Sequence, residues 1–300
     1  MEKIIYLAAP RGFCAGVRHA LATVDDTLKR FKQPVFVFNS IVHNNFIVNS
    51  LRQRGITFVK TLNNIPAGTP LIFSAHGVSQ QIEEQAKAMQ LQIIDATCPL
   101  VKKIHHKARE RFDAGDRIIL IGHRSHPEVI GTLGQISGRA EVIETVADVE
   151  SLIVDERPLA CLTQTTLSIY DTGPIMAALR TKFPNLDSSA TDICYATRRR
   201  QEAVRTMAAK CEVIFIIGSA ASSNSNRMRE TAERVGVRAF MLDRATELTD
   251  KMLINAEHIG ISAGASAPES LVVELIEELK LRGWTDIRKF APKQKIDDYS

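Results

Sequence analysis

The chain has 300 residues, of which 45% are hydrophobic, and its formal net charge is +4. A chain of this length can bury about three-quarters of its unfolded surface, so we expect two domains or three small ones. The slight positive charge favours anionic ligands only weakly and is scattered along the predicted helices, so we do not expect a nucleic-acid-binding protein. No apolar run approaches the ~20 residues of a membrane span. Five cysteines and an N-terminal strand in place of an export signal indicate reduced thiols and a cytoplasmic protein.

An apolar strand, a cysteine and a basic amphipathic helix follow one another three times along the chain. The three occurrences centre on Cys14, Cys98 and Cys194. Before Cys98, Ile93–Thr97 is predicted to be a short buried strand, and Val101–Arg111 after it is predicted to be a helix. Thr191–Ile193 is the corresponding stretch before Cys194. An internal repeat of this kind predicts three similar structural units.

Each unit continues with two more strands, and each strand ends in a polar loop before a helix. The first strands, 34–38, 117–121 and 213–217, lead to loops that carry His43-Asn44, His126-Pro127-Glu128 and Ser222-Ser223-Asn224. The second strands, 71–74, 159–162 and 259–262, lead to Ala75-His76-Gly77, Thr163-Gln164-Thr165-Thr166 and Ala263-Gly264-Ala265-Ser266. Alternating strands and helices predict parallel sheets, which bind ligands at the carboxyl ends of their strands. We therefore expect an α/β fold of three pseudo-repeated units, each with a small, mostly parallel sheet, around a common centre.

The cysteines also mark the expected boundaries between the units. The predicted units are residues 14–97, 98–193 and 194–282, preceded by a strand within 1–13 and followed by a tail, 283–300. The residues from Trp284 onward show no periodicity and are expected to form a loose surface extension.

Three cysteines at helix starts indicate a metal site, because the helix N-terminus favours the thiolate. Three sulfur ligands suit zinc or an iron–sulfur cluster, and a cubane cluster with three cysteines keeps one iron open to substrate. A single cysteine before a helix is more often a packing residue, and only the threefold recurrence favours a site. Cys161 and Cys211 do not recur and are expected in the core.

Imidazole, hydroxyl and amide groups gather in the strand-end loops. They belong to His43, His76, His126, Ser222, Ser223, Asn224 and Ser266. Together with backbone N–H groups, such donors can hold a diphosphate without the lysine of a P-loop. The alternative is an ordinary histidine or a helix cap, which Ser223 or Ser225 could equally be.

Glu128 stands at an expected helix start, where a carboxyl group shielded from water can act as a proton donor. Thr165 and Thr166 could relay a proton or hold a hydroxyl group. The alternatives are an ordinary first-turn glutamate and helix caps.

Several long motifs of the chain resemble those of 4-hydroxy-3-methylbut-2-enyl diphosphate reductases. They are Pro10-Arg11-Gly12-Phe13-Cys14-Ala15-Gly16-Val17, Ile41-Val42-His43-Asn44, Phe73-Ser74-Ala75-His76-Gly77-Val78, Asp95-Ala96-Thr97-Cys98-Pro99-Leu100-Val101, His126-Pro127-Glu128-Val129, Thr163-Gln164-Thr165-Thr166-Leu167-Ser168, Ile193-Cys194-Tyr195-Ala196-Thr197, Ser222-Ser223-Asn224-Ser225 and Ala263-Gly264-Ala265-Ser266-Ala267-Pro268. The resemblance runs from about Ile4 to Leu281.

The resemblance implies an iron–sulfur oxidoreductase of the non-mevalonate isoprenoid pathway. Such an enzyme reduces the allylic alcohol diphosphate by two electrons to isopentenyl and dimethylallyl diphosphates, with loss of water. It takes electrons from reduced ferredoxin or flavodoxin, and its N-terminal strand packs with the third unit.

The resemblance also implies a role for each motif residue. In that family pattern, a [4Fe-4S] cluster is held by Cys14, Cys98 and Cys194, and its fourth iron takes the substrate hydroxyl. Glu128 delivers protons, with Thr165 in the relay and His126 close by. The diphosphate is bound by His43, His76, Ser222, Ser223, Asn224 and Ser266, with His126, Thr165 and Thr166 also at the substrate.

The chain departs from the common family pattern without losing a ligand or the acid. The departures are His19, Arg124-Ser125, Ala220-Ala221, Arg198-Arg199 and the tail after Arg282. The residues themselves leave three other classes open. One is a non-redox, aconitase-like dehydratase, the second is a redox or iron sensor, and the third is a zinc hydrolase.

Overall fold

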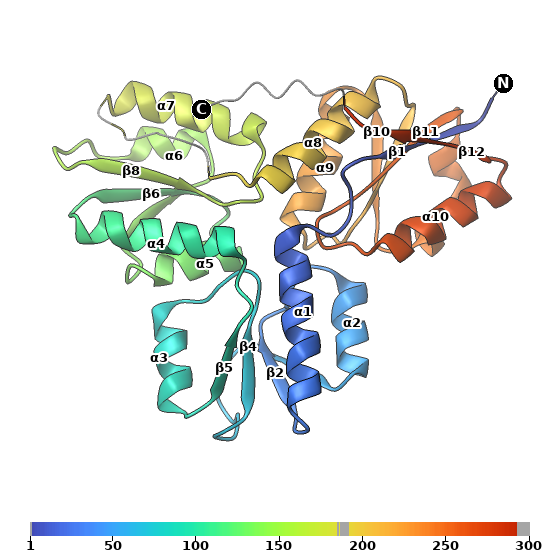
Figure 1. The fold of residues 1–300 in the computed structure, drawn as a ribbon. Helices are drawn as coiled ribbons and strands as arrows, with labels where there is room; N and C mark the ends of the chain where they lie inside the picture. The colour runs from blue at the N-terminus through green and yellow to red at the C-terminus, as the bar shows by residue number, and fades with distance from the viewer. Residues whose placement is uncertain (1, 185, 187–191, 293–300) are drawn as a thin grey trace. The chain divides into compact units, whose positions relative to one another are not determined.

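The computed structural model describes residues 2–184, 186 and 192–292, whose strands form three sheets (Figure 1). These residues fall into two compact units. Unit 1 contains the described residues of Met1–Cys14, His43–Ile47 and Tyr195–Ser300, and unit 2 contains those of Ala15–Val42 and Val48–Cys194. None of the helices in the described ranges has the length and apolar character that a membrane crossing requires.

Unit 1 is built on a five-stranded sheet with helices on both faces. The strands, in spatial order, are β10 (Arg238–Leu242), β9 (Val213–Ile217), β11 (His258–Ala263), β1 (Ile4–Ala8) and β12 (Asp286–Phe290). The helices are α8 (Tyr195–Ala208), α9 (Ser223–Arg234) and α10 (Glu269–Leu281), with the short 3₁₀ turns η1 (Ala245–Glu247) and η2 (Asp250–Leu253). All pairs are parallel.

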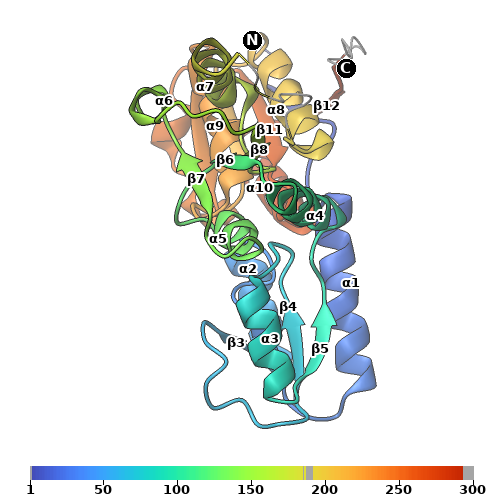
Figure 2. The ribbon, with the colours of Figure 1, turned by 90° about the vertical axis from the view of Figure 1, so that its left-hand side faces the viewer.

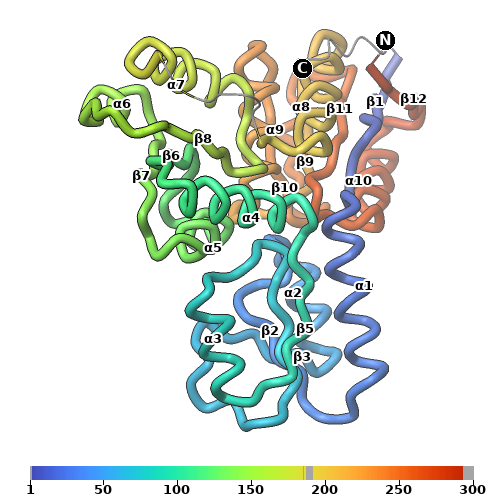
Figure 3. Tube along the Cα trace, turned by 60° about the vertical axis from the view of Figure 1, so that its left-hand side comes forward, coloured from blue at the N-terminus to red at the C-terminus, as the bar shows by residue number. Residues whose placement is uncertain are grey.

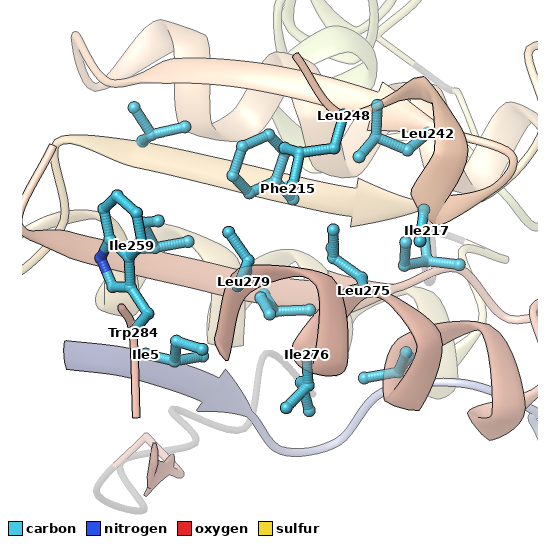
Figure 4. Packing of buried hydrophobic residues seen from close by; sticks show 14 of the residues in the cluster. Ile5, Phe215, Ile217, Leu242, Leu248, Ile259, Leu275, Ile276, Leu279 and Trp284 are labelled. Atoms are coloured by element: carbon cyan, nitrogen blue, oxygen red, sulfur yellow. The ribbon is translucent and has the colours of Figure 1, made fainter. Parts of the chain in front are cut away.

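The apolar side chains of β9 alternate between the two faces of this sheet. Phe215 packs with Leu275 and Leu279 of α10 in one cluster (Figure 4), and Ile214 and Ile216 pack with α8 and α9 in another. All five residues of β9 are fully buried, as expected for a central parallel strand that is covered on both sides.

Unit 2 contains a four-stranded parallel sheet near its N-terminal end. The strands, in spatial order, are β3 (Ile56–Val59), β2 (Val35–Phe38), β4 (Pro70–Phe73) and β5 (Gln92–Asp95), and the associated helices are α1 (Ala15–Arg30), α2 (Asn45–Gln53) and α3 (Gln80–Ala88). Figure 2 shows α1 and α3 on opposite faces of this sheet.

The remaining sheet of unit 2 has three parallel strands. They are β7 (Ala140–Ile143), β6 (Arg117–Ile121) and β8 (Leu159–Thr163), with helices α4 (Pro99–Asp113), α5 (Pro127–Gly134), α6 (Val146–Ser151) and α7 (Ile169–Lys182). α4 and α5 cover one face and α6 and α7 the other (Figure 3). The prediction of an α/β fold with three small parallel sheets is confirmed, whereas the three-way domain division stays a prediction.

Three local predictions are wrong. β5 is an edge strand with Ile93 and Ile94 half-buried, because only β4 pairs with it. Asp192 and Ile193 are not in a strand, and Thr191 lies outside the described residues. The segment after Arg282 is not loose, because β12 pairs with β1 and the indole of Trp284, 4% exposed, donates to the carbonyl of Glu257 at 2.9 Å. Residues 293–300 lie outside the described part.

Candidate functional site

The three recurrent cysteines occupy equivalent positions in the backbone. Each directly precedes a helix, is half-buried and forms no disulfide. Each cysteine N–H donates to the carbonyl two residues past the end of a strand: Cys14 to Ala265 (3.2 Å), Cys98 to Ala75 (3.0 Å) and Cys194 to Thr165 (3.0 Å). The repeat seen in the sequence is therefore also a repeat of backbone hydrogen bonds, which ties each cysteine to a polar strand-end loop.

The recurrent cysteines differ in their surroundings from the other two cysteines of the chain. Cys98 is the N-cap of α4, yet its side chain makes no capping hydrogen bond. Cys161 and Cys211 differ, since both are packed in apolar clusters and burial raises the pKa of each thiol to about 12. Cys14 belongs to unit 1, and Cys98 and Cys194 belong to unit 2. Within the described part of either unit alone, no three His, Cys, Asp or Glu side chains could hold a metal ion.

Glu128 lies in the first turn of α5 and is only 3% exposed. Its two carboxyl oxygens accept hydrogen bonds from the backbone N–H (2.6 Å) and the hydroxyl (2.8 Å) of Thr165. Burial raises the pKa of Glu128 from 4.5 to about 7, outweighing the hydrogen bonds from Thr165 that lower it, and the charge of Asp192 raises it further. The group can therefore hold a proton near neutral pH.

Thr165 joins this acid to one of the cysteines. Its N–H and hydroxyl bind Glu128, while its carbonyl accepts the N–H of Cys194. The neighbouring Thr166 is half-buried and accepts a hydrogen bond from Gln164 at 2.8 Å. A single residue thus separates the buried carboxyl group from the backbone of Cys194.

Two histidines lie near Glu128 in unit 2. His126 is the N-cap of α5, and its Nδ1 accepts the N–H of Glu128 at 3.2 Å, so in the neutral ring the proton is on Nε2. The rings of His76 and His126 meet edge to face, with centroids 5.8 Å apart. Two predicted substrate ligands are therefore neighbours, although fifty residues of chain separate them.

Gly77 explains how the loop with His76 fits against its surroundings. Its φ of +75° favours glycine, and a Cβ there would lie 2.5 Å from Cε1 of His105, a 6% exposed residue of α4. Burial is also the main reason why the pKa of His105 is lowered to about 4. The neutral ring of His105 fills the space that Gly77 leaves.

The strand-end loops of unit 1 carry neutral donors. Ser222 is the N-cap of α9, and its Oγ accepts from the N–H (3.3 Å) and the hydroxyl (3.0 Å) of Ser225, which leaves its own proton for another acceptor. Ser223 is the first residue of α9 and is half-buried. The cap that the sequence suggested at Ser223 or Ser225 is therefore at Ser222.

Asn224 and Ser266 lie in the same unit. Asn224 is 3% exposed, and its buried Oδ1 has no hydrogen-bond partner in the described structure, which is unusual unless a ligand or water binds there. Ser266 donates its hydroxyl to the carbonyl of His43 at 2.9 Å. Burial lowers the pKa of His43 below 6.5, so its imidazole is neutral at pH 7.

The LytB protein family model matches residues 5–280 of this chain. The chain belongs to the LytB family. It is 47% identical over 286 residues to the 4-hydroxy-3-methylbut-2-enyl diphosphate reductase of Azoarcus sp. strain BH72, covering 95% of this chain and 92% of the relative. It is 49% identical over 281 residues to the reductase of Methylococcus capsulatus, covering 92% and 90%.

Solved structures agree with this LytB assignment. The E-1-hydroxy-2-methyl-but-2-enyl-4-diphosphate reductase of Plasmodium falciparum matches with a TM-score of 0.94 and 36% identity, over 100% of this chain and 96% of that one. A structure described as the terminal enzyme of the non-mevalonate pathway matches with a TM-score of 0.67 and 30% identity, over 93% and 99%. The predicted family and the predicted class, an oxidoreductase, are confirmed.

Two aspartates that form hydrogen bonds near these LytB motifs were not singled out from the sequence. Asp192 accepts hydrogen bonds from the N–H of Thr163 (3.1 Å) and from Lys107 (3.3 Å). These bonds connect the segment just before Cys194 with β8 and with α4. Asp243, at the end of β10, binds Ser219 and Asn45. Neither aspartate stands in a recognisable motif, because its partners are distant in the chain.

Proposed function

We propose that this chain reduces (E)-4-hydroxy-3-methylbut-2-enyl diphosphate to isopentenyl diphosphate and dimethylallyl diphosphate, the terminal reaction of the non-mevalonate pathway. The names of the relatives and of the matching structures support the substrate. The observation that carries the chemistry is the position of Thr165 between the Glu128 carboxyl group and the N–H of Cys194. It provides a proton source beside a predicted cluster ligand.

In this proposal, the thiolates of Cys14, Cys98 and Cys194 hold one [4Fe-4S] cluster. Their common position before a helix and their common backbone hydrogen bond support this ligand set. When bound, a cubane with three cysteine ligands supplies electrons and an open iron that can take the substrate hydroxyl. Reduced ferredoxin or flavodoxin is the proposed source of the electrons.

The reaction consumes two electrons and two protons for each substrate molecule. The C–O bond to the hydroxyl group breaks, the hydroxyl leaves as water with one proton, and the other proton forms a C–H bond on the allylic carbon skeleton. Glu128 suits the role of proton donor, because burial raises its pKa to about 7 and keeps a proton on it at neutral pH. Thr165 holds the carboxyl group and connects it to the substrate, with His126 next to the acid.

The diphosphate is proposed to bind neutral donors of the strand-end loops. The proposed ligands are His43, Ser222, Ser223, Asn224 and Ser266 in unit 1 and His76, His126, Thr165 and Thr166 in unit 2. The donor proton of Ser222 and the buried, unsatisfied amide oxygen of Asn224 support the unit 1 part of this set. Ser266 must turn its hydroxyl away from the His43 carbonyl to donate to a phosphate oxygen.

The test is an anaerobic preparation of the whole chain assayed with the allylic diphosphate and a reduced viologen. We expect close to four iron and four sulfide per chain, and conversion to the two products only when reductant is present. Turnover without reductant would identify the aconitase-like dehydratase instead. An active, colourless, zinc-loaded protein would rule out the cluster.

A further inference from the structure

A short segment, His43–Ile47, belongs to unit 1, although the chain on both sides of it belongs to unit 2. Ile41 and Val42 before it and Val48 after it are buried in unit 2. The segment carries His43, whose carbonyl accepts the hydroxyl of Ser266, so whatever holds the segment to unit 1 also determines where this imidazole lies.

Polar contacts hold the segment at the carboxyl ends of β9, β10 and β11. The N–H of Asn45 donates to Oγ of Ser219 at 3.1 Å, and the side-chain amide of Asn45 donates to Oδ2 of Asp243 at 2.8 Å. Ser219, 1% exposed, in turn donates its hydroxyl to Oδ1 of Asp243. Both oxygens of the Asp243 carboxylate are thus used, one directly on Asn45 and one through Ser219.

Apolar and cationic contacts add to this attachment. Phe46 packs against the apolar cluster that contains Phe215, and the guanidinium of Arg244 lies 5.3 Å from the centre of the Phe46 ring. Arg244 also pairs with Glu274 of α10 at 3.1 Å. The segment would therefore stay near unit 1 even without Asp243, and Asp243 determines its orientation rather than its attachment.

We propose that Asp243 is a positioning residue for diphosphate binding, which acts through Asn45 and Ser219 on His43. The inference rests on the proposed function, because that function makes His43 a ligand of the diphosphate. Hydrogen bonds to a carboxylate are stronger and more directional than those between neutral groups, which suits a group that must fix the direction of a backbone segment.

The single change Asp243→Asn tests this role with little change in shape. It replaces one of the two acceptor oxygens with an NH₂ group and removes the negative charge, so in either orientation of the amide only one of the two donors, Asn45 or Ser219, keeps its acceptor. We expect the KM for the allylic diphosphate and the Kd for inorganic diphosphate to rise about tenfold, roughly the worth of one charge-assisted hydrogen bond. The kcat and the iron content should change less than twofold, because Asp243 contacts neither proposed acid nor proposed cluster ligands.

An exchange of the two side chains provides the rescue. In Asn45→Asp combined with Asp243→Asn, the amide at position 243 donates to the carboxylate at position 45 and its oxygen still accepts the hydroxyl of Ser219. We expect each single change to weaken diphosphate binding and the double change to restore it to within about threefold of wild type. General structural damage would not be repaired by adding a second substitution.

The action through His43 is tested in a His43→Ala background, where Asp243→Asn should have no further effect on KM. The matched control is Asp250→Asn, which removes an exposed carboxylate of the same unit that pairs with Arg282, and should leave KM unchanged.

Additive effects of His43→Ala and Asp243→Asn, or wild-type diphosphate affinity in Asp243→Asn, would overturn the inference. An inactive wild-type holoenzyme would instead contradict the proposed function, and the Kd measurements with inorganic diphosphate would still decide the role of Asp243.

Discussion

In unit 2, the strand-end loops beside Cys98 and Cys194 carry two imidazoles and the buried acid Glu128, whereas the loops after β9 and β11 of unit 1 carry hydroxyl and amide groups. The backbone differs far less, because all three cysteines donate their N–H to the second residue past a strand. The same hydrogen-bonded frame therefore supports two chemistries. The position of each cysteine relative to a strand end is therefore repeated, whereas the reactivity of each loop depends on its side chains and on their burial.

Two carboxyl groups of unit 2 show how burial determines the reactivity of a side chain at such a position. Glu128 is 3% exposed and its pKa is raised to about 7. Glu144, at the end of β7 in the same unit, receives a hydrogen bond from the N–H of Arg124 at 3.0 Å, and this bond is the main reason why its pKa is lowered. A carboxyl group at a strand end becomes a proton donor only when desolvation outweighs its hydrogen bonds.

Replacing the three cysteines should have the largest effect on activity, although the backbone hydrogen bonds of the frame are kept. Cys14→Ala, Cys98→Ala and Cys194→Ala should each reduce turnover to background, because each removes one of the three proposed sulfur ligands. Iron and sulfide per chain, measured after anaerobic purification, should fall well below four. The control is Cys161→Ala, whose thiol lies in an apolar cluster and whose loss should cost about 1 kcal/mol of stability but no iron. Full iron content in any one of the three ligand variants would remove that cysteine from the proposed set.

The special chemistry of unit 2 is tested by Glu128→Gln. The amide keeps the shape of the side chain but cannot deliver a proton, so we expect kcat to fall by about 10²–10⁴-fold. Cluster content and the Kd for inorganic diphosphate should remain unchanged. Glu144→Gln removes an ionised carboxyl group of the same unit, and this variant should retain nearly full turnover. Equal losses in the two variants would show that the burial of Glu128 is not what matters.

Thr165→Val sharpens the link between the acid and the cysteine. It removes the hydroxyl that donates to Glu128 but leaves the two backbone hydrogen bonds. That hydroxyl lowers the pKa of Glu128, so its loss raises the pKa further and keeps the acid protonated to higher pH. The basic limb of kcat/KM should therefore move to higher pH, with turnover about tenfold lower. Thr166→Val, which does not touch Glu128, should leave the limb where wild type has it.

The sequence predicted those parts of the fold that depend on neighbouring residues. β6 and β9 are found at the predicted residues, since each is a continuous apolar run next to turn residues. The three cysteines were recognised because their context recurs. Glu128 could be chosen as the acid from its place at a helix start, but Thr165, which fixes it through a hydrogen bond, lies in a strand-end loop 37 residues away.

The remaining features depend on contacts between distant parts of the chain. β12 has only its end residues half-buried and so shows no apolar periodicity, yet it is held by hydrogen bonds to β1 at the other end of the chain. Asp243 and Asn45 are polar residues in polar surroundings, and nothing local distinguishes them from surface loops. His105 stands in a basic helix, and its burial follows from the close approach of Gly77 and of Gly131 in α5.

The smallest expected effect compares two glycines of unit 2 with the same backbone conformation. Gly77 and Gly68 have φ of +75° and +76°, so an alanine at either position costs about 1 kcal/mol of backbone strain. A Cβ at Gly68 meets nothing within 4 Å, while one at Gly77 overlaps the ring of His105. Gly77→Ala should therefore destabilise the protein by about 1–3 kcal/mol more than Gly68→Ala, measured by urea unfolding.

The excess cost at Gly77 should depend mainly on His105, because the nearest atom of another residue, Cγ2 of Thr97, lies 3.3 Å from the added Cβ. Adding His105→Ala to each glycine variant removes the ring, so most of the difference between Gly77→Ala and Gly68→Ala should then disappear, which a double-mutant cycle measures directly. A difference that survives would mean that the backbone of the loop, and not the buried imidazole, requires glycine beside His76. The loop next to the proposed diphosphate ligand would then be held by its own turn, as the loops of unit 1 are, and not by packing against α4.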